Sequence, residues 1–232
     1  FPPRHPARDA TKAGGGTEAV IGSVDASLKG KGSKWQKVAN SLRARLAMDR
    51  SKADPAKAAT ELAAAIAAGV MTSNSDNAMM AWPGDGVFDN PWASNFGTRD
   101  DHRMSKTLLD TMNALNDPRV AVYAQPTVAD PTKYTGLQNG LTNPYSAFAT
   151  TTSRPGAIFY PGATSYGTFG TAAGKRTPSN LMNYAEVAFI QAEAAERGSG
   201  GVPGAAACCS AAVPGAMQQG GVTAGQAAAV PA

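Results

Sequence analysis

Apolar side chains recur at helical spacing in four segments of the chain. In the first segment they fall at i, i+3, i+4, i+7 and i+11, as one stripe of a 3.6-residue period; they are Trp35, Val38, Ala39, Leu42 and Leu46. We expect this helix to end near Ser51. A second helix should start at Pro55 after an Asp54 N-cap and run to about Ala68, with Gly69 as a left-handed stop.

Two further stripes predict the third and fourth helices. The third helix carries Met104, Leu108, Met112 and Leu115 in register and stops at Asn116-Asp117-Pro118. The fourth starts at Thr177-Pro178, ends at Arg197-Gly198, and places Leu181, Ala185, Ala188, Phe189 and Ala192 on one stripe.

Two long irregular segments separate these helices, residues 72–103 and residues 119–177. Both are rich in turn residues, and we expect short strands at most, around Val120–Tyr123 and Ala157–Tyr160. Loops this long without a pattern of their own are uncommon and tend to be functional. The sequence therefore predicts a mostly α fold, in which a helical scaffold carries long irregular loops.

Composition divides the 232-residue chain into three parts. Residues 1–34 form a Gly/Pro/Lys-rich arm that we expect to be irregular, residues 35–198 form the helical domain, and residues 199–232 form an Ala/Gly-rich tail that is weakly ordered or an eroded helix. The net charge of +4 lies mostly in the arm, which argues against nucleic-acid binding. Apolar runs are too short for a spanning helix, and the adjacent Cys208-Cys209 pair suits neither a disulfide framework nor a zinc site.

Five blocks of sequence, in order along the chain, form a pattern. The first is the Trp35 block, KWQKVANSLRARLAM. The other four are Asn90-Pro91 with Arg103-Met104-Ser105, Leu115 to Arg119, Tyr134-Thr135-Gly136 with Asn139-Gly140, and Tyr184 to Gly198. These blocks resemble, in the same order, those of the SusD/RagB-like outer-membrane nutrient-binding lipoproteins, whose first block is a W-K-K-F-A-N-S-L-R-L-R-L-A helix. Each block alone is weak, and the five in the family's order over most of the chain form a specific pattern.

The resemblance implies a fold of tetratricopeptide-like helix pairs with irregular ligand-bearing loops. It also implies a non-catalytic role without a cofactor: capture of an oligosaccharide or peptide nutrient at the cell surface, and delivery to a TonB-dependent, SusC-like transporter of the outer membrane. Members of the family are about twice as long and carry a lipid anchor, so we expect this chain to be partial. Membrane contact would then come only through an anchor that this chain lacks.

Candidate ligand residues lie in the two long loops. Sugar rings stack on flat aromatic faces, and their hydroxyls need amide or carboxylate partners. The residues that supply both kinds of group are Trp82, Asp85, Asp89, Trp92, Asn95 and Tyr166. The alternative is that Trp82 and Trp92 pack against the helical scaffold and anchor the loop there, and that Asn90-Pro91 forms a turn.

Charged residues inside the helix blocks suggest an ion pair between the first and fourth helices. The candidates are Arg43 and Arg45 on the first helix, with Glu186 and Glu193 on the fourth. The alternative is two solvated helix faces, since exposed pairs stabilise a fold little.

Two other classes of function stay open. Helical repeats often serve as protein-interaction modules without a small ligand. The loop carboxylates Asp85, Asp89, Asp100 and Asp101, with His102, could also be arranged as a glycoside hydrolase. Catalytic fingerprints such as a nucleophile elbow or a P-loop are missing from the sequence, as is a metal-binding pattern.

Overall fold

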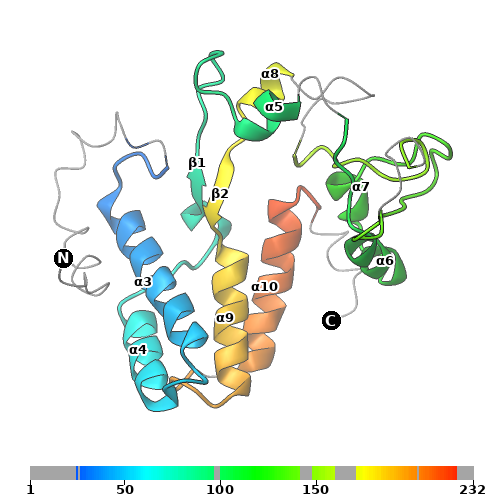
Figure 1. Cartoon of the computed structure of the whole chain (residues 1–232). Coiled ribbons are helices and arrows are strands. Elements are labelled where there is room, and N and C mark those ends of the chain that lie inside the picture. The colour runs from blue at the N-terminus through cyan, green and yellow to red at the C-terminus, as the bar shows by residue number, and fades with distance from the viewer. Residues whose placement is uncertain are drawn as a thin grey trace. The chain divides into compact units, whose positions relative to one another are not determined.

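The computed structural model describes residues 25, 27–96, 100–141, 148–159, 171–202 and 204–223, with only the backbone for 94–96. The chain forms two compact units, Phe1–Met80 with Asn180–Ala216 and Ala81–Ser179 with Met217–Ala232. Most of the described secondary structure is helical, and the only sheet among these residues has two strands (Figure 1). The predicted mostly α fold is therefore confirmed.

The first unit is built from helices, with a small sheet at one end of α9 (Figure 1). Its elements are α3 (Gly32–Asp49), α4 (Pro55–Ala67), the 3-10 turn η1 (Asn74–Asp76), β1 (Ala78–Met80), β2 (Ser179–Met182), α9 (Tyr184–Glu196) and most of α10 (Ala205–Gln219). Helix α3 packs against both α4 and α9. No helix among the described residues is long and apolar enough to cross a bilayer.

Helix α4 begins and ends as the sequence predicts. The Asp54 carboxylate accepts a hydrogen bond from the Lys57 amide at 3.1 Å, and Pro55 occupies the first turn. After α4, Gly69 adopts a φ of +95°, in the left-handed region that favours glycine. The Asn40 amide of α3 then donates to the carbonyls of Ala68 and Gly69 at 3.1 and 2.9 Å, which satisfies carbonyls that the helix itself leaves open.

The buried face of α3 differs from its most apolar stripe. Leu42 and Leu46 are exposed, whereas the buried residues are Asn40, Ser41, Ala44, Ala47 and Met48. Small side chains let the neighbouring helices approach closely, and Ala44 joins Leu62 and Ala194 in one core cluster. Burial on α3 is thus set by size and hydrogen bonding as well as by hydropathy.

One of the expected helix-to-helix ion pairs is present. Arg45 of α3 lies 2.5 Å from Glu186 of α9. Arg43 does not reach α9 and instead pairs with Glu61 of α4 at 2.7 Å, because residues two apart on a helix point in nearly opposite directions. Glu193 also differs from the expectation, since it pairs with Arg197 one turn further along its own helix.

The second unit carries most of the irregular chain. Its elements are α5 (Pro91–Phe96), α6 (Lys106–Ala114), α7 (Val120–Tyr123) and α8 (Ala172–Lys175). A core cluster of Met104, Leu109, Met112 and Ala124 joins α6 and α7 to the loops. Two isolated bridges, Ser105 with Leu137 and Ala124 with Pro155, tie the loops to these helices.

Three sequence predictions about local structure are wrong. The strand expected at Val120–Tyr123 is helix α7, which starts because the Asp117 carbonyl and the Arg119 carbonyl accept the amides of Val120 and Tyr123. Of the strand expected around Ala157–Tyr160, residues 157–159 form a turn, and Tyr160 lies outside the described residues. The fourth helix starts at Tyr184 rather than at Thr177-Pro178. Residues Ser179–Met182 pair with β1 instead, and the Asn183 side chain caps α9 by accepting the Glu186 amide at 2.8 Å.

Residues 205–219 of the tail form helix α10, in which Ala212 and Met217 are buried. Pro214 lies inside this helix, and Gly215 lies where an added Cβ would sit 3.1 Å from the Tyr184 ring. The arm before Asp25 and the last residues of the tail lie outside the described residues. The three-part division of the chain stays a prediction.

Candidate functional site

The loop that follows β1 is fastened to the segment around α8. The Trp82 indole N–H donates to the Ser179 hydroxyl at 2.9 Å. The Asn90 amide donates to the Thr177 carbonyl at 2.6 Å, and the Asp89 carboxylate lies 3.0 Å from the Lys175 ammonium. Directly after Trp82, the Pro83 carbonyl accepts a hydrogen bond from the Arg176 guanidinium at 3.1 Å. Helices α5 and α8 consequently pack against one another (Figure 1).

A tight turn at residues 84–89 fixes the tip of this loop. Asp85 Oδ1 accepts the amides of Val87 and Phe88 at 2.9 and 2.8 Å, and Asp89 Oδ1 accepts the Gly86 amide at 2.9 Å. Gly84 and Gly86 have φ values of +65° and +91°, which the turn needs and glycine tolerates. Both predicted ligand carboxylates therefore hold the backbone of the turn.

These contacts also set the charge state of the two aspartates. The hydrogen bonds from the Phe88 and Val87 amides lower the pKa of Asp85 below its ordinary value. The pKa of Asp89 is lowered mainly by the hydrogen bond from the Gly86 amide, and to a smaller extent by the hydrogen bond from the Lys175 side chain. Both side chains are accordingly carboxylates at neutral pH.

Trp92 stands at the start of α5 as part of an aromatic cluster. Its ring meets the His102 ring nearly edge-on, with centroids 5.4 Å apart, and lies 6.0 Å from the Phe159 ring. Phe159 in turn meets Tyr123 of α7 at 6.1 Å. The Trp92 residue nevertheless remains 45% exposed. The cluster therefore supports an aromatic surface that is open to solvent.

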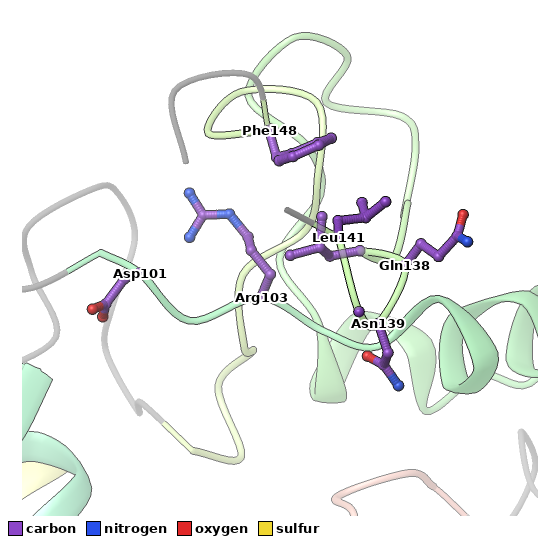
Figure 2. Close-up of a pocket in the computed structure, with 8 residues that line it drawn as sticks. Asp101, Arg103, Gln138, Asn139, Leu141 and Phe148 are labelled. Atoms are coloured by element: carbon purple, nitrogen blue, oxygen red, sulfur yellow. The ribbon is translucent and has the colours of Figure 1, made fainter. Parts of the chain in front are cut away.

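A pocket of about 400 Å³ lies among the loops of the same unit. Its lining comes from the segment before α6 and from the loop after residue 136: Asp101, Arg103, Leu137, Gln138, Asn139, Gly140, Leu141 and Phe148. Figure 2 shows the Arg103 side chain extending to the side away from Leu141, while Gln138 and Asn139 diverge from the loop that carries them. The lining thus combines apolar carbons with amide and charged groups.

Buried ion pairs hold Arg103 in this wall. Asp100 contacts Arg103 at 3.1 Å and Arg154 at 2.5 Å, and all three side chains are at most 7% exposed. Arg103 also donates to the carbonyls of His102 and Ala149 at 2.6 and 3.1 Å. This network joins the segment before α6 to the segment around Ala149 and Arg154, which follows the pocket residue Phe148.

The sequence-predicted ligand residues occupy different places. Trp92 is on the open aromatic surface, Trp82 fastens the loop, and Asp85 and Asp89 build the turn. Asn95 belongs to α5, but its side chain lies outside the described residues, as does all of Tyr166. Whether any of them touches a ligand stays a prediction.

Sequence reasoning did not select the other members of this site as ligand residues, namely His102, Gln138, Asn139, Phe148 and Phe159. Asn139-Gly140 lies in one of the blocks that carry the family resemblance, and the aromatic character of the second long loop, which holds Phe148 and Phe159, is a further signal in the sequence. Among the described residues, no cluster of three or more His, Cys, Asp or Glu side chains could hold a metal ion.

Comparisons with known proteins place the chain in a family. Residues 13–230 match the SusD-like family described as "Starch-binding associating with outer membrane". A chitin-binding SusD homologue of Flavobacterium johnsoniae is 31% identical, with a TM-score of 0.78 over 95% of this chain. SusD-like proteins of Bacteroides thetaiotaomicron and Bacteroides vulgatus are 28% and 27% identical, with TM-scores of 0.74 and 0.73 over 94% and 93% of the chain.

The match is partial on the side of those structures. This chain spans 42%, 42% and 41% of their respective lengths, so it corresponds to less than half of each protein. A comparison with curated proteins gave no significant match. Because the family match covers nearly the whole chain and the structural matches agree with it, the chain belongs to the SusD-like family of starch-binding proteins that associate with the outer membrane.

Proposed function

We propose that this chain is part of a protein that captures oligosaccharides without cleaving them. The observation that carries the proposal is the Trp92 surface: a partly exposed indole, supported by the rings of His102 and Phe159. His102 adjoins Asp101 in the chain, and Asp101 lines the pocket. A sugar on Trp92 would therefore lie next to a second recess.

The chemistry of the two parts suits a carbohydrate. The C–H face of a sugar ring packs on an aromatic ring, and its hydroxyls exchange hydrogen bonds with amides and carboxylates. Gln138 and Asn139 offer amides, and Leu141 and Phe148 offer apolar surface. A volume of about 400 Å³ lies at the lower end of the range of small-ligand pockets, roughly 300–1,000 Å³.

The relatives support a carbohydrate over a peptide. The family description names starch, and the Flavobacterium johnsoniae homologue binds chitin. We propose that the full protein lies at the outer membrane, on the cell surface and held by a lipid anchor, and passes its ligand to a TonB-dependent, SusC-like transporter. The family description supports the membrane association.

The carboxylates give little support to a hydrolase. A glycosidase needs one carboxylic acid whose pKa is raised so that it can donate a proton. Backbone hydrogen bonds lower the pKa of both Asp85 and Asp89, and Asp100 is held between two guanidiniums. These three residues are thus suited to holding structure rather than to acid catalysis.

Glycan binding by Trp92 variants tests the proposal. Affinities for starch and chitin oligosaccharides would be measured by calorimetry for the wild-type chain, Trp92→Ala and Trp92→Tyr. We expect Trp92→Ala to weaken binding at least about tenfold, or roughly 1.4 kcal/mol, and Trp92→Tyr to retain most of it. Val128→Ala, which trims an exposed apolar residue of another loop, is the matched control.

Two results would count against this function. If folded Trp92→Ala binds as tightly as the wild type, the aromatic surface is not the ligand site. If the wild-type chain releases reducing sugar from the oligosaccharides, the non-catalytic assignment is wrong.

A further inference from the structure

The tip of the loop before α5 presents two apolar side chains to solvent. Val87 is 78% exposed and Phe88 is 62% exposed. Neither side chain belongs to the Trp92 cluster or to the pocket lining. Together they offer a small apolar contact surface that includes one aromatic ring.

The tip is rigid, so its exposure is a fixed feature of the turn. Asp85 and Asp89 hold the amides of residues 86–88, and the Gly84 amide donates to the Phe88 carbonyl at 3.2 Å. A Cβ on Gly84 would come within 2.4 Å of Arg176 Cγ, so the turn is also seated closely on the α8 segment. A ligand that binds a preformed surface loses little further conformational entropy from the protein.

The size of the tip favours a sugar over a protein partner. A stable protein interface buries about 800 Å² on each side, whereas a single aromatic side chain offers roughly 150–250 Å². Val87 and Phe88 together therefore provide too little apolar area for a docking surface of their own. The face of one phenyl ring does match the C–H face of one sugar ring.

A hydrogen-bond acceptor lies beside the phenyl ring. Asp85 accepts the Val87 and Phe88 amides with Oδ1, its side chain is exposed, and in the described part of the chain no other residue donates a hydrogen bond to Oδ2. A sugar that stacks on Phe88 could donate a hydroxyl to this oxygen. The aspartate that builds the turn would then also orient the sugar.

We propose that Phe88, with Val87 and Asp85, forms a second glycan contact for the polysaccharide whose chain occupies the Trp92 surface. This inference rests on the proposed carbohydrate-binding function. Two contacts on one polymer raise the overall affinity because the second contact forms within the complex. The tip therefore contributes to retention of long chains.

Affinity electrophoresis and calorimetry on the full chain, with starch, chitin and an oligosaccharide ladder, test this contact. We expect Phe88→Ala to weaken binding of the longest chains about threefold to tenfold. Phe88→Tyr, which keeps the ring, should bind as the wild type does. Val128→Ala is the control for loss of an exposed apolar side chain elsewhere.

The outcomes separate this contact from the primary site. If Phe88→Ala binds long chains like the wild type while Trp92→Ala is weakened, the tip contact is wrong and the capture function stands. If the wild-type chain binds no glycan, both proposals fail. If Phe88→Ala instead abolishes self-association in sedimentation, or binding to anionic phospholipid vesicles, with glycan affinity unchanged, the tip serves another partner and the inference is overturned.

Discussion

The Asn90 side chain accepts the backbone amide of Trp92 at 2.8 Å and so caps the start of α5. The nitrogen of the same side chain donates to the Thr177 carbonyl, and the backbone N–H of Asn90 donates to the Lys175 carbonyl at 2.8 Å. Asn90 is 4% exposed. The orientation of the exposed indole is thereby tied to a segment more than eighty residues away in sequence.

Replacement of Asn90 should disturb Trp92 without touching its side chain. Asn90→Ala removes the side-chain partner of the Trp92 amide and of the Thr177 carbonyl, so we expect a loss of about 1–3 kcal/mol in unfolding free energy. We also expect the acrylamide quenching constant of Trp92 fluorescence to differ between Asn90→Ala and the protein with Asn90. It can be measured in a background where Trp35 and Trp82 are replaced by Phe, so that Trp92 alone emits.

A conservative variant separates positioning from stability. Asn90→Asp keeps the acceptor for the Trp92 amide but places a carboxylate against the Thr177 carbonyl. We therefore expect the Trp92 quenching constant of Asn90→Asp to lie between those of the protein with Asn90 and of Asn90→Ala. Its loss of stability should be similar to that of Asn90→Ala. Identical quenching in all three proteins would show that Asn90 does not orient Trp92.

The buried Asp100, which holds Arg103 in the pocket wall, should be more sensitive to mutation than its neighbour Asp101. Asp100→Ala removes the carboxylate that Arg103 and Arg154 share, and removing one partner of a buried ion pair typically costs about 3–5 kcal/mol. Chemical denaturation gives this difference directly. The neighbouring Asp101→Ala is the matched control, because its side chain is 40% exposed, and its cost should stay within about 0.5 kcal/mol. Equal losses for the two variants would contradict the role of Asp100.

The ion pairs of α3 give a prediction about coupling between mutations. A double-mutant cycle on Arg45 and Glu186 should show a coupling of a few tenths of a kcal/mol, because the two side chains are 34% and 36% exposed. A cycle on Arg43 and Glu186 should be additive, since Arg43 contacts Glu61 instead. Thermal or urea unfolding measures both cycles. Coupling in the second cycle, or none in the first, would contradict this pairing.

Much of the fold could be predicted from the sequence because helix signals are local. Asp54, Pro55 and Gly69 mark the ends of α4 by their own backbone chemistry, and the structure has them in those roles. The sequence pattern predicts a start of α9 that is too early, because residues 179–182 form β2, and β2 depends on pairing with a strand about a hundred residues away. A local pattern carries no information about such a partner.

The site was less predictable for a similar reason. Trp92 could be chosen from its residue type, but its support comes from His102, which lies beyond the end of α5, and from Phe159, which is distant in sequence. Asp85 and Asp89 have the composition of sugar ligands, yet the turn that they form uses their oxygens for backbone amides. Residue types predict what a loop can bind, whereas its folding decides which groups are left to bind it.

Asp25 gives a prediction about pH, since its carboxylate holds the turn before α3. It accepts the amides of Ser27, Leu28 and Gly30 at 2.9, 3.1 and 2.8 Å, and the Trp35 indole N–H at 2.7 Å. Partial burial acts to raise the pKa of Asp25, but the hydrogen bonds outweigh it and lower the pKa from 3.8 to about 2.

Because the folded-state pKa lies below the unfolded one, this stabilisation is complete above the unfolded value of 3.8 and is lost as the pH falls toward 2. After solvent screening we expect about 1 kcal/mol from the ionised group at neutral pH. Urea unfolding of the wild type and Asp25→Asn between about pH 6 and pH 3 measures it. The difference between the two proteins should shrink as the pH falls. A constant difference across this range would mean that folding does not depend on ionisation of Asp25.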